Sequence, residues 1–239
     1  MKKQLLGASV VLLLSACQSN SISQQNNIES AAGNSAANAS QAKQSEAQRL
    51  NQLLEQYFSE TMELNPVYAT FVGENAYNHK FSAPLTEENR AKELAFDKKY
   101  LKLINDIDKS QLQGQDLLSY QIFKQDREMS ILGASFDQYL LPFNQMYGVH
   151  NFFATLGSGA SAQPFNTAKD YDNFEQRAKG FALFMDSAIE AMREGIEKEV
   201  VLPKAIIEKV IPQLQAHVVE DVKSSVFYGP LTMLEENEQ

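Results

Sequence analysis

The spacing of apolar residues after residue 45 constrains the fold more than any other feature, because it repeats every three or four positions. The first such stripe consists of Leu50, Leu53, Leu54, Tyr57 and Phe58, with charged and polar residues between them. This is the period of a helix with one buried face. Alternation typical of strands is scarce, and the short run 139–141 is the best candidate. The pattern predicts an all-α, multi-helix body.

Proline, glycine and capping residues divide that body into further helices. A short helix is expected between Pro66 and Gly73, because proline favours the first helical position and glycine the end. Thr86 begins a helix that is apolar on two sides and should therefore pack between others. A helix is expected over 115–132, followed by an irregular stretch over 134–166. The next helix is expected over 168–199, with a capping box at Thr167 and Asp170 and a break near Gly180. Pro203 opens the last expected helix, which bends at Pro212 and carries Val218.

Composition divides the chain into four parts. Residues 1–16 read as a lipoprotein signal peptide, and residues 17–45 as a cysteine followed by a linker of serine, asparagine, glutamine and alanine. Such a linker cannot bury enough apolar surface to offset its chain entropy. Residues 46–234 form the predicted helical domain, and residues 235–239 form a charged tail.

The N-terminus predicts a lipid anchor. Two lysines precede the ten-residue apolar run 5–14, which is too short to span a bilayer but suits a signal peptide. The run ends in Leu-Ser-Ala-Cys, which resembles the lipobox of bacterial lipoproteins. That resemblance implies acylation of Cys17 with fatty acids such as palmitate. The absence of aspartate after Cys17 implies the outer membrane, with the body facing the periplasm. An ordinary secretory signal with an incidental cysteine is the alternative.

Charge and residue counts exclude several functional classes. The formal net charge is −9, so binding of nucleic acid through phosphate contacts is not expected. The chain has three histidines and one cysteine, which excludes a cysteine-based zinc finger and an intramolecular disulfide. Membrane contact is therefore expected through the lipid rather than through basic residues.

The stretch 142–150 is the strongest candidate binding segment. It brings Asn144, Gln145, Tyr147 and His150 into one glycine-containing loop. Loops of this composition often line ligand sites, so these four residues are candidates for binding a ligand. A buried connection whose amides satisfy the loop backbone is the alternative.

Three other patterns carry weaker functional interpretations. His217 and Glu220 have a helical spacing that can chelate a metal, although a solvated helix end explains them equally well. Asp170, Asp172 and Glu175 suit a cation, but acidic residues also favour a helix N-terminus. The segments 40–43 and 159–163 resemble serine-hydrolase motifs without a structural setting for them. No catalytic or metal-binding residue is predicted.

Taken together, the segments resemble a bacterial lipoprotein family catalogued as domain of unknown function 885. The resemblance covers nearly all of residues 46–234. It rests on the order and spacing of short sequence segments. In the first part of the body these are residues 64–66, 69–70 and 73, then 114–116 and 118–120, then 141–146 and 148–150. In the second part they are residues 163–165, 170–171, Arg177, 193–196, Pro203, 208–210 and 227–231.

The resemblance implies a mostly helical, zinc-dependent, peptidase-like protein more than twice as long as this chain. Its presumed catalytic motif, His-Glu-x-x-Pro-Gly-His, has no counterpart here. No cofactor is therefore expected in this chain, although the full-length family protein implies zinc. The sequence is interpreted as an N-terminal region that is inactive alone, with a peptide substrate or the missing C-terminal half as partner. The resemblance further implies that Asn144, Gln145, Tyr147 and His150 face the substrate cleft of the complete enzyme. The alternatives are a stand-alone periplasmic module that binds peptides or proteins and a structural lipoprotein without a ligand.

Overall fold

The computed structural model describes residues 44–232. The predicted signal peptide, Cys17, nearly all of the predicted linker and the charged tail at 235–239 lie outside the described residues. Within the described range the chain forms α-helices and 3-10 helices and no strand, which confirms the all-α prediction. No helix in the range 44–232 is both long enough and apolar enough to cross a membrane.

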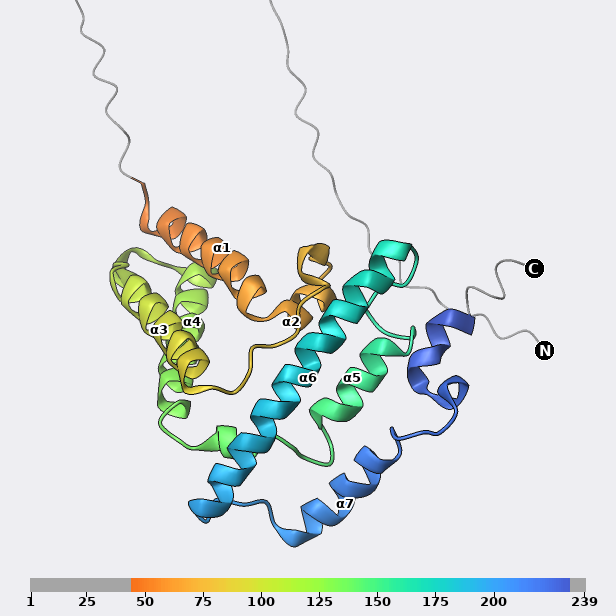
Figure 1. The fold of residues 1–239 in the computed structure, drawn as a ribbon. Helices are drawn as coiled ribbons and strands as arrows, with labels where there is room; N and C mark the ends of the chain where they lie inside the picture. The colour runs from red at the N-terminus through yellow and green to blue at the C-terminus, as the bar shows by residue number, and fades with distance from the viewer. Residues whose placement is uncertain (1–43, 233–239) are drawn as a thin grey trace, which may run out of the picture. The chain divides into compact units, whose positions relative to one another are not determined.

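Seven α-helices form the body (Figure 1), and residues 229–232 begin a further helical turn at the end of the described range. Their bounds are α1 Glu46–Leu64, α2 Pro66–Phe71, α3 Glu87–Asn105, α4 Gly114–Gly133, α5 Val149–Gly157, α6 Ala168–Glu197 and α7 Lys204–Gln215. The 3-10 helices are η1 Asn75–Tyr77, η2 Lys109–Gln111, η3 Gln138–Leu140, η4 Val222–Ser224 and η5 Val226–Tyr228.

The predicted starts of the helices are largely confirmed. Pro66 stands at the first position of α2, and Thr86 caps α3 by accepting a hydrogen bond from the Asn89 amide. Thr167 and Asp170 form the expected capping box at the start of α6. These signals succeed because a cap satisfies backbone amides within one turn and needs no distant partner.

Four sequence expectations are wrong. The run 139–141 is not a strand, because Gln138–Leu140 turns into η3. The stretch 134–166 contains a helix that was not expected, α5. Helix α6 continues through Gly180 without a break, because one glycine costs a long helix only about 1 kcal/mol. Phe81 packs closely there, since a Cβ on Gly180 would lie 3.1 Å from the Cβ of Phe81. Helix α7 ends at Gln215, so Val218 lies beyond it.

Helices α1, α3 and α4 pack side by side around the first hydrophobic core (Figure 1, orange to green). As expected, α3 lies against both of its neighbours. Tyr57 is central, because its ring meets those of Tyr100 and Phe123 edge to face at centroid distances of 4.9 and 4.8 Å. The buried members of this core are Leu50, Leu53, Tyr100, Ile104, Ile107, Leu112, Tyr120 and Phe123.

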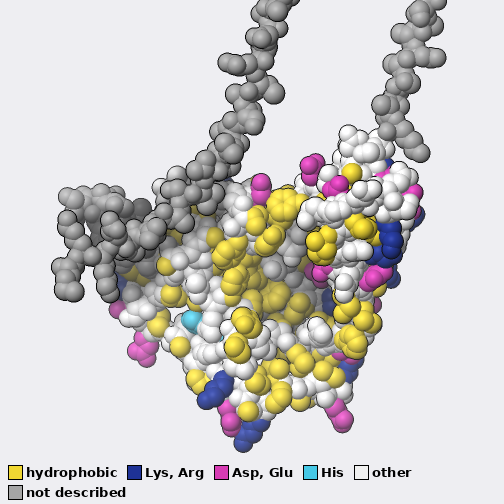
Figure 2. All heavy atoms as spheres, turned by 180° about the vertical axis from the view of Figure 1, so that it is seen from behind, with side chains coloured by type: hydrophobic (Ala, Val, Ile, Leu, Met, Phe, Trp, Pro, Cys, Tyr) yellow, Lys and Arg dark blue, Asp and Glu magenta, His cyan; other side chains and the backbone are white. Residues whose placement is uncertain are grey.

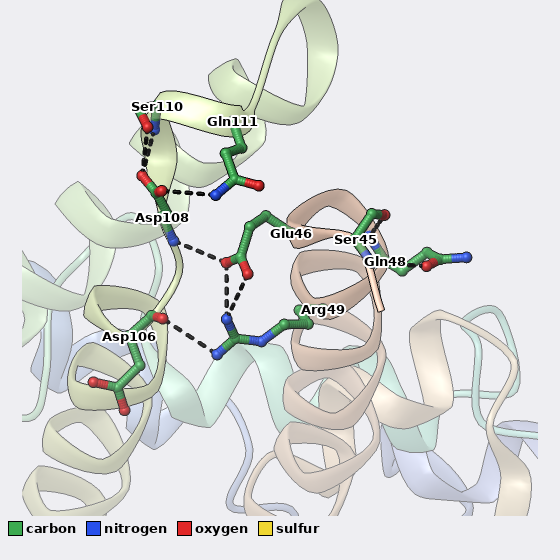
Figure 3. Close-up of polar contacts among 8 residues, drawn as sticks. All are labelled: Ser45, Glu46, Gln48, Arg49, Asp106, Asp108, Ser110 and Gln111. Atoms are coloured by element: carbon green, nitrogen blue, oxygen red, sulfur yellow. Dashed lines mark hydrogen bonds and ion pairs between the residues drawn. The ribbon is translucent and has the colours of Figure 1, made fainter. Parts of the chain in front are cut away.

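A polar clasp joins the first turn of α1 to the end of α3 (Figure 3). The Glu46 carboxylate accepts hydrogen bonds from Arg49 at 2.7 Å and from the Asp108 amide at 2.9 Å. Arg49 in turn donates to the Asp106 carbonyl oxygen at 3.2 Å. The Asp108 amide, followed by Arg49, holds the pKa of Glu46 below its usual value. The clasp therefore ties the start of α1 to the end of α3.

The second core lies between α2, α5 and α6. Phe153 of α5 stacks on Phe181 of α6 with a centroid distance of 3.9 Å, and Phe81 meets both rings edge to face. A third core joins α6 to α7 through Phe143, Ala188 and Val210. The long helix α6 thus contributes to the second and third cores. It also supports the loop 142–148, which leads into α5 (Figure 1).

Candidate functional site

The loop before α5 carries Asn144, Gln145 and Tyr147 of the predicted substrate cleft, whereas His150 lies in α5 itself and not in the loop as expected. Asn144 turns its side chain onto the loop itself, because its Oδ1 accepts hydrogen bonds from the amides of Met146 at 2.9 Å and Tyr147 at 2.5 Å. This is the local bonding that favours asparagine in turns. The side chain of Tyr147 points outward and is 82% exposed, and Met146 is exposed beside it.

His150 lies in the first turn of α5 and is only 4% exposed. Its Nε2 is 3.1 Å from Oε1 of Gln213 on α7, while the Gln213 Nε2 donates to the Gln145 carbonyl oxygen at 3.0 Å. Because an amide oxygen only accepts, His150 donates from Nε2, and its Nδ1 is a buried acceptor without a partner among the described residues. The loop is thereby fastened to α7.

The electrostatic surroundings keep His150 uncharged. Burial lowers the pKa of its imidazole, the nearby His217 lowers it further, and the Gln213 hydrogen bond opposes them in part. The two imidazole centroids are 6.3 Å apart, and His217 Nε2 is 3.0 Å from Oδ1 of Asn151. A neutral, buried imidazole can position a loop or accept a proton, but it offers no positive charge to a ligand.

These contacts bring the four predicted residues together and give them different orientations. Tyr147 is available to a partner, whereas Asn144 and His150 bond within the molecule. Their role in a substrate cleft therefore stays a prediction. The sequence alternative, in which a loop amide satisfies loop backbone, describes Asn144 well.

Sequence reasoning named Arg177 of α6 only among the residues that carry the resemblance and gave it no role, yet it is the most buried polar group among the described residues, with no exposed surface. Its guanidinium donates to five acceptors drawn from four segments of the chain. They are the carbonyl oxygens of Pro66, Tyr77 and Lys80, Oγ1 of Thr70 and Oε1 of Gln163, at distances of 2.6–3.2 Å.

Burial lowers the pKa of Arg177 to about 10, and no acidic side chain among residues 44–232 forms an ion pair with it. The guanidinium remains charged at neutral pH and is stabilised by carbonyl dipoles instead of a carboxylate. One sequence signal was available. Arg177 interrupts an aromatic stripe of α6 formed by Phe174, Phe181 and Phe184.

A second polar cluster lies between α3 and α4. Arg127 is held between Asp97 and Asp126, and its guanidinium lies 4.7 Å from the centroid of the Tyr57 ring. Burial, and then the neighbouring Asp97, raise the pKa of the Glu93 carboxyl group. A small hollow of about 220 Å³ adjoins these groups. Arg127 is paired with carboxylates of the protein itself, so the cluster chiefly joins α3 to α4.

The weaker sequence candidates do not form sites among the described residues. His217 and Glu220 follow the end of α7 and so share no helical face. Asp170 serves the capping box, and Glu175 pairs with Lys179 at 2.7 Å. Residues 44–232 contain no group of three histidine, cysteine, aspartate or glutamate side chains able to hold a metal ion. The zinc that the resemblance implies therefore has no ligand set here.

Comparison with known proteins gives one match. A family model described as "Bacterial protein of unknown function (DUF885)" matches residues 66–239, from the start of α2 onward. No curated protein and no solved structure matches the chain. The matched range includes the loop 142–150, Arg177 and α7, and it leaves out α1.

Proposed function

Because the chain belongs to the DUF885 family of bacterial proteins of unknown function, we propose that it is a lipid-anchored N-terminal region of a peptidase-like protein. In this proposal Cys17 carries the lipid, the body faces the periplasm, and this region is catalytically inactive alone. The described residues supply binding surface and a scaffold. The proposal assigns no metal-dependent chemistry to the described residues, because they provide no set of metal ligands.

The observation that carries the proposal is the amount of aliphatic surface left uncovered on the C-terminal half of the body. Helix α6, helix α7 and the segment that follows α7 expose large apolar side chains that a self-contained protein would bury. They are Leu183, Ile189, Ile211, Val218 and Val222. Figure 2 shows hydrophobic side chains gathered over the middle of one face, with charged groups mainly toward its edges. A further part of the same protein is the expected cover.

The first test is the size and lipidation of the native product. An antibody against the folded body is used to blot membranes of cells that make the protein, with radioactive palmitate as a label. We expect a labelled band more than twice the 26.8 kDa of this chain, and no label in a Cys17→Ser variant. A soluble, unlabelled band would contradict the anchor. A labelled band near 26.8 kDa would contradict the larger protein.

A second candidate function is a stand-alone periplasmic module that binds peptides or proteins. Its support is the loop 142–148, which internal hydrogen bonds hold in place while Met146 and Tyr147 are presented outward. Exposed aromatic and methionine side chains on a fixed loop suit a binding surface. The blot separates the two candidates, because the module requires the short product.

A further inference from the structure

An aliphatic hollow lies where α6 turns into α7. Its volume is about 230 Å³. The lining consists entirely of aliphatic and methionine side chains, from the end of η3, the last turns of α6, the connecting segment and the start of α7. They are Leu140, Leu141, Met192, Ile196, Val200, Val201, Leu202 and Ile207. At its rim, Ile196 is 68% exposed and Val201 is 58% exposed.

An unusual turn builds this hollow. Glu199 has a φ of 58°, the only positive φ of a non-glycine residue in the described range. The Val200 amide donates to the Gly195 carbonyl oxygen at 2.8 Å, and the Glu199 amide donates to that of Ile196 at 3.3 Å. These are the two bonds of a Schellman motif, whose left-handed position normally carries glycine. The turn folds Val200 back over α6, where a Cβ on Gly195 would lie 2.6 Å from the Val200 carbonyl oxygen.

The connecting segment beside the hollow also has unused hydrogen-bonding groups. Residues 200–203 are outside any helix, and the amides of Val201 and Leu202 have no hydrogen-bond acceptor among the described residues. An exposed stretch of this kind can pair with the main chain of an added peptide, while a neighbouring pocket receives one side chain. The hollow and the free amides therefore point to the same class of ligand.

We infer that this hollow binds an extended peptide through one bulky aliphatic side chain, with the peptide main chain bonded to the segment 200–203. The volume lies below the range of about 300–1,000 Å³ that is usual for whole small molecules, so it suits a single side chain. A long acyl chain would not fit. The inference deepens the proposed role of the body as a binding region, but it uses a surface other than the predicted cleft residues.

The test uses the full chain in lipid nanodiscs with isotope-labelled isoleucine methyl groups. The probe is the blocked pentapeptide acetyl-Gly-Gly-Leu-Gly-Gly-amide. We expect saturable shifts of the Ile196 and Ile207 methyl signals. Replacement of the central leucine by aspartate should weaken binding about tenfold or more, because the burial of the aliphatic group is lost. Methylation of the leucine nitrogen should weaken binding as well, because the added methyl group hinders the close main-chain approach that lets the Val201 and Leu202 amides donate to peptide carbonyl oxygens.

Matched variants locate the site. Ile196→Asp should weaken binding of the leucine peptide about tenfold or more. Leu183→Asp, on the same helix and 61% exposed, should leave binding unchanged, since Leu183 is not part of the hollow. Circular dichroism checks that both variants fold. The wild-type signals report on the hollow even if a variant fails to fold.

Three results would overturn the inference: no saturable shift at Ile196 or Ile207, equal weakening by both variants, or equal binding of the aspartate or N-methylated peptide. The blot of native membranes decides the proposed function separately. A short or unlabelled product leaves the peptide titration valid, and a failed titration leaves the product size unaffected.

Discussion

At the scale of the residue, the fold depends on a few side chains that satisfy several segments at once. Arg177 is the clearest case, because one guanidinium bonds to α2, to the carbonyl oxygens of Tyr77 and Lys80, and to Gln163. A buried cation without a carboxylate partner depends fully on these acceptors. Replacement of Arg177 therefore tests how much these hydrogen bonds contribute to the stability of the fold.

Arg177→Met should lower the free energy of unfolding by about 3 kcal/mol or more, because buried acceptors lose charged hydrogen bonds. Arg177→Lys should recover only part of the loss, since an ammonium group has three donors and the guanidinium here makes five bonds. Urea denaturation measures both variants. If Arg177→Met matches the wild type, the bonds described here contribute no net stability.

His150 predicts a pH dependence. Burial lowers its pKa in the folded state below the usual value of 6.5, so the unfolded chain binds the proton first as the pH falls. Stability should therefore decrease from about pH 6.5 downward, toward the lower pKa of the folded state. In His150→Gln this part of the slope should disappear in thermal unfolding between pH 7.5 and 5. A slope that persists unchanged would assign it to other groups, His217 among them.

Glu199 occupies a left-handed position that costs a non-glycine residue about 1 kcal/mol. Glu199→Gly should therefore stabilise the protein by about 0.5–1 kcal/mol, with part of the relief offset by the greater freedom of glycine in the unfolded chain. Chemical denaturation measures the change. Glu197→Gly, inside α6, is the contrasting variant and should destabilise.

At the scale of the element, the polar clasp decides whether α1 stays joined to the end of α3. Glu46→Gln keeps the size of the side chain but removes the negative charge that Arg49 and the Asp108 amide both contact. We expect a lower melting temperature at pH 7. The pKa of Glu46 is lowered in the folded state, so this contribution is present above about pH 4.5 and is lost as the pH falls through the lower folded value.

The matched control is Glu55→Gln on the same helix, for which the structure gives no hydrogen bond or ion pair. The difference in melting temperature between Glu46→Gln and the wild type should shrink on acidification, while Glu55→Gln stays close to the wild type throughout. A constant difference down to pH 3 would mean that the replacement of an acceptor oxygen by an amide nitrogen, rather than the lost charge, is responsible.

At the scale of the whole molecule, the body combines closed hydrophobic cores with an uncovered aliphatic surface. Helices α1, α3 and α4 enclose a buried core, and apolar side chains remain exposed on α1 and α4 as well as on α6 and α7. The folded chain should therefore bind a hydrophobic dye at pH 7 and still unfold in a cooperative transition. Ile196→Asp combined with Val201→Asp should reduce the dye signal without lowering helicity.

The sequence by itself determined the helical class and most helix starts, because caps, proline and apolar spacing act within one or two turns. Thr86, Thr167 and Pro66 are examples. It also placed Asn144, Gln145 and Tyr147 in one loop, although His150, expected in the same loop, follows directly after it in α5. The order and spacing of segments along the chain indicated the family.

Only the tertiary structure decided how those residues are oriented. His150 is buried and bonded to Gln213 of α7, and Phe81 packs closely against Gly180 in the middle of α6. The five partners of Arg177 and the hollow beside Val201 depend on contacts between segments far apart in the chain. The local spacing of residues does not predict such contacts, since they form only when separate elements pack together.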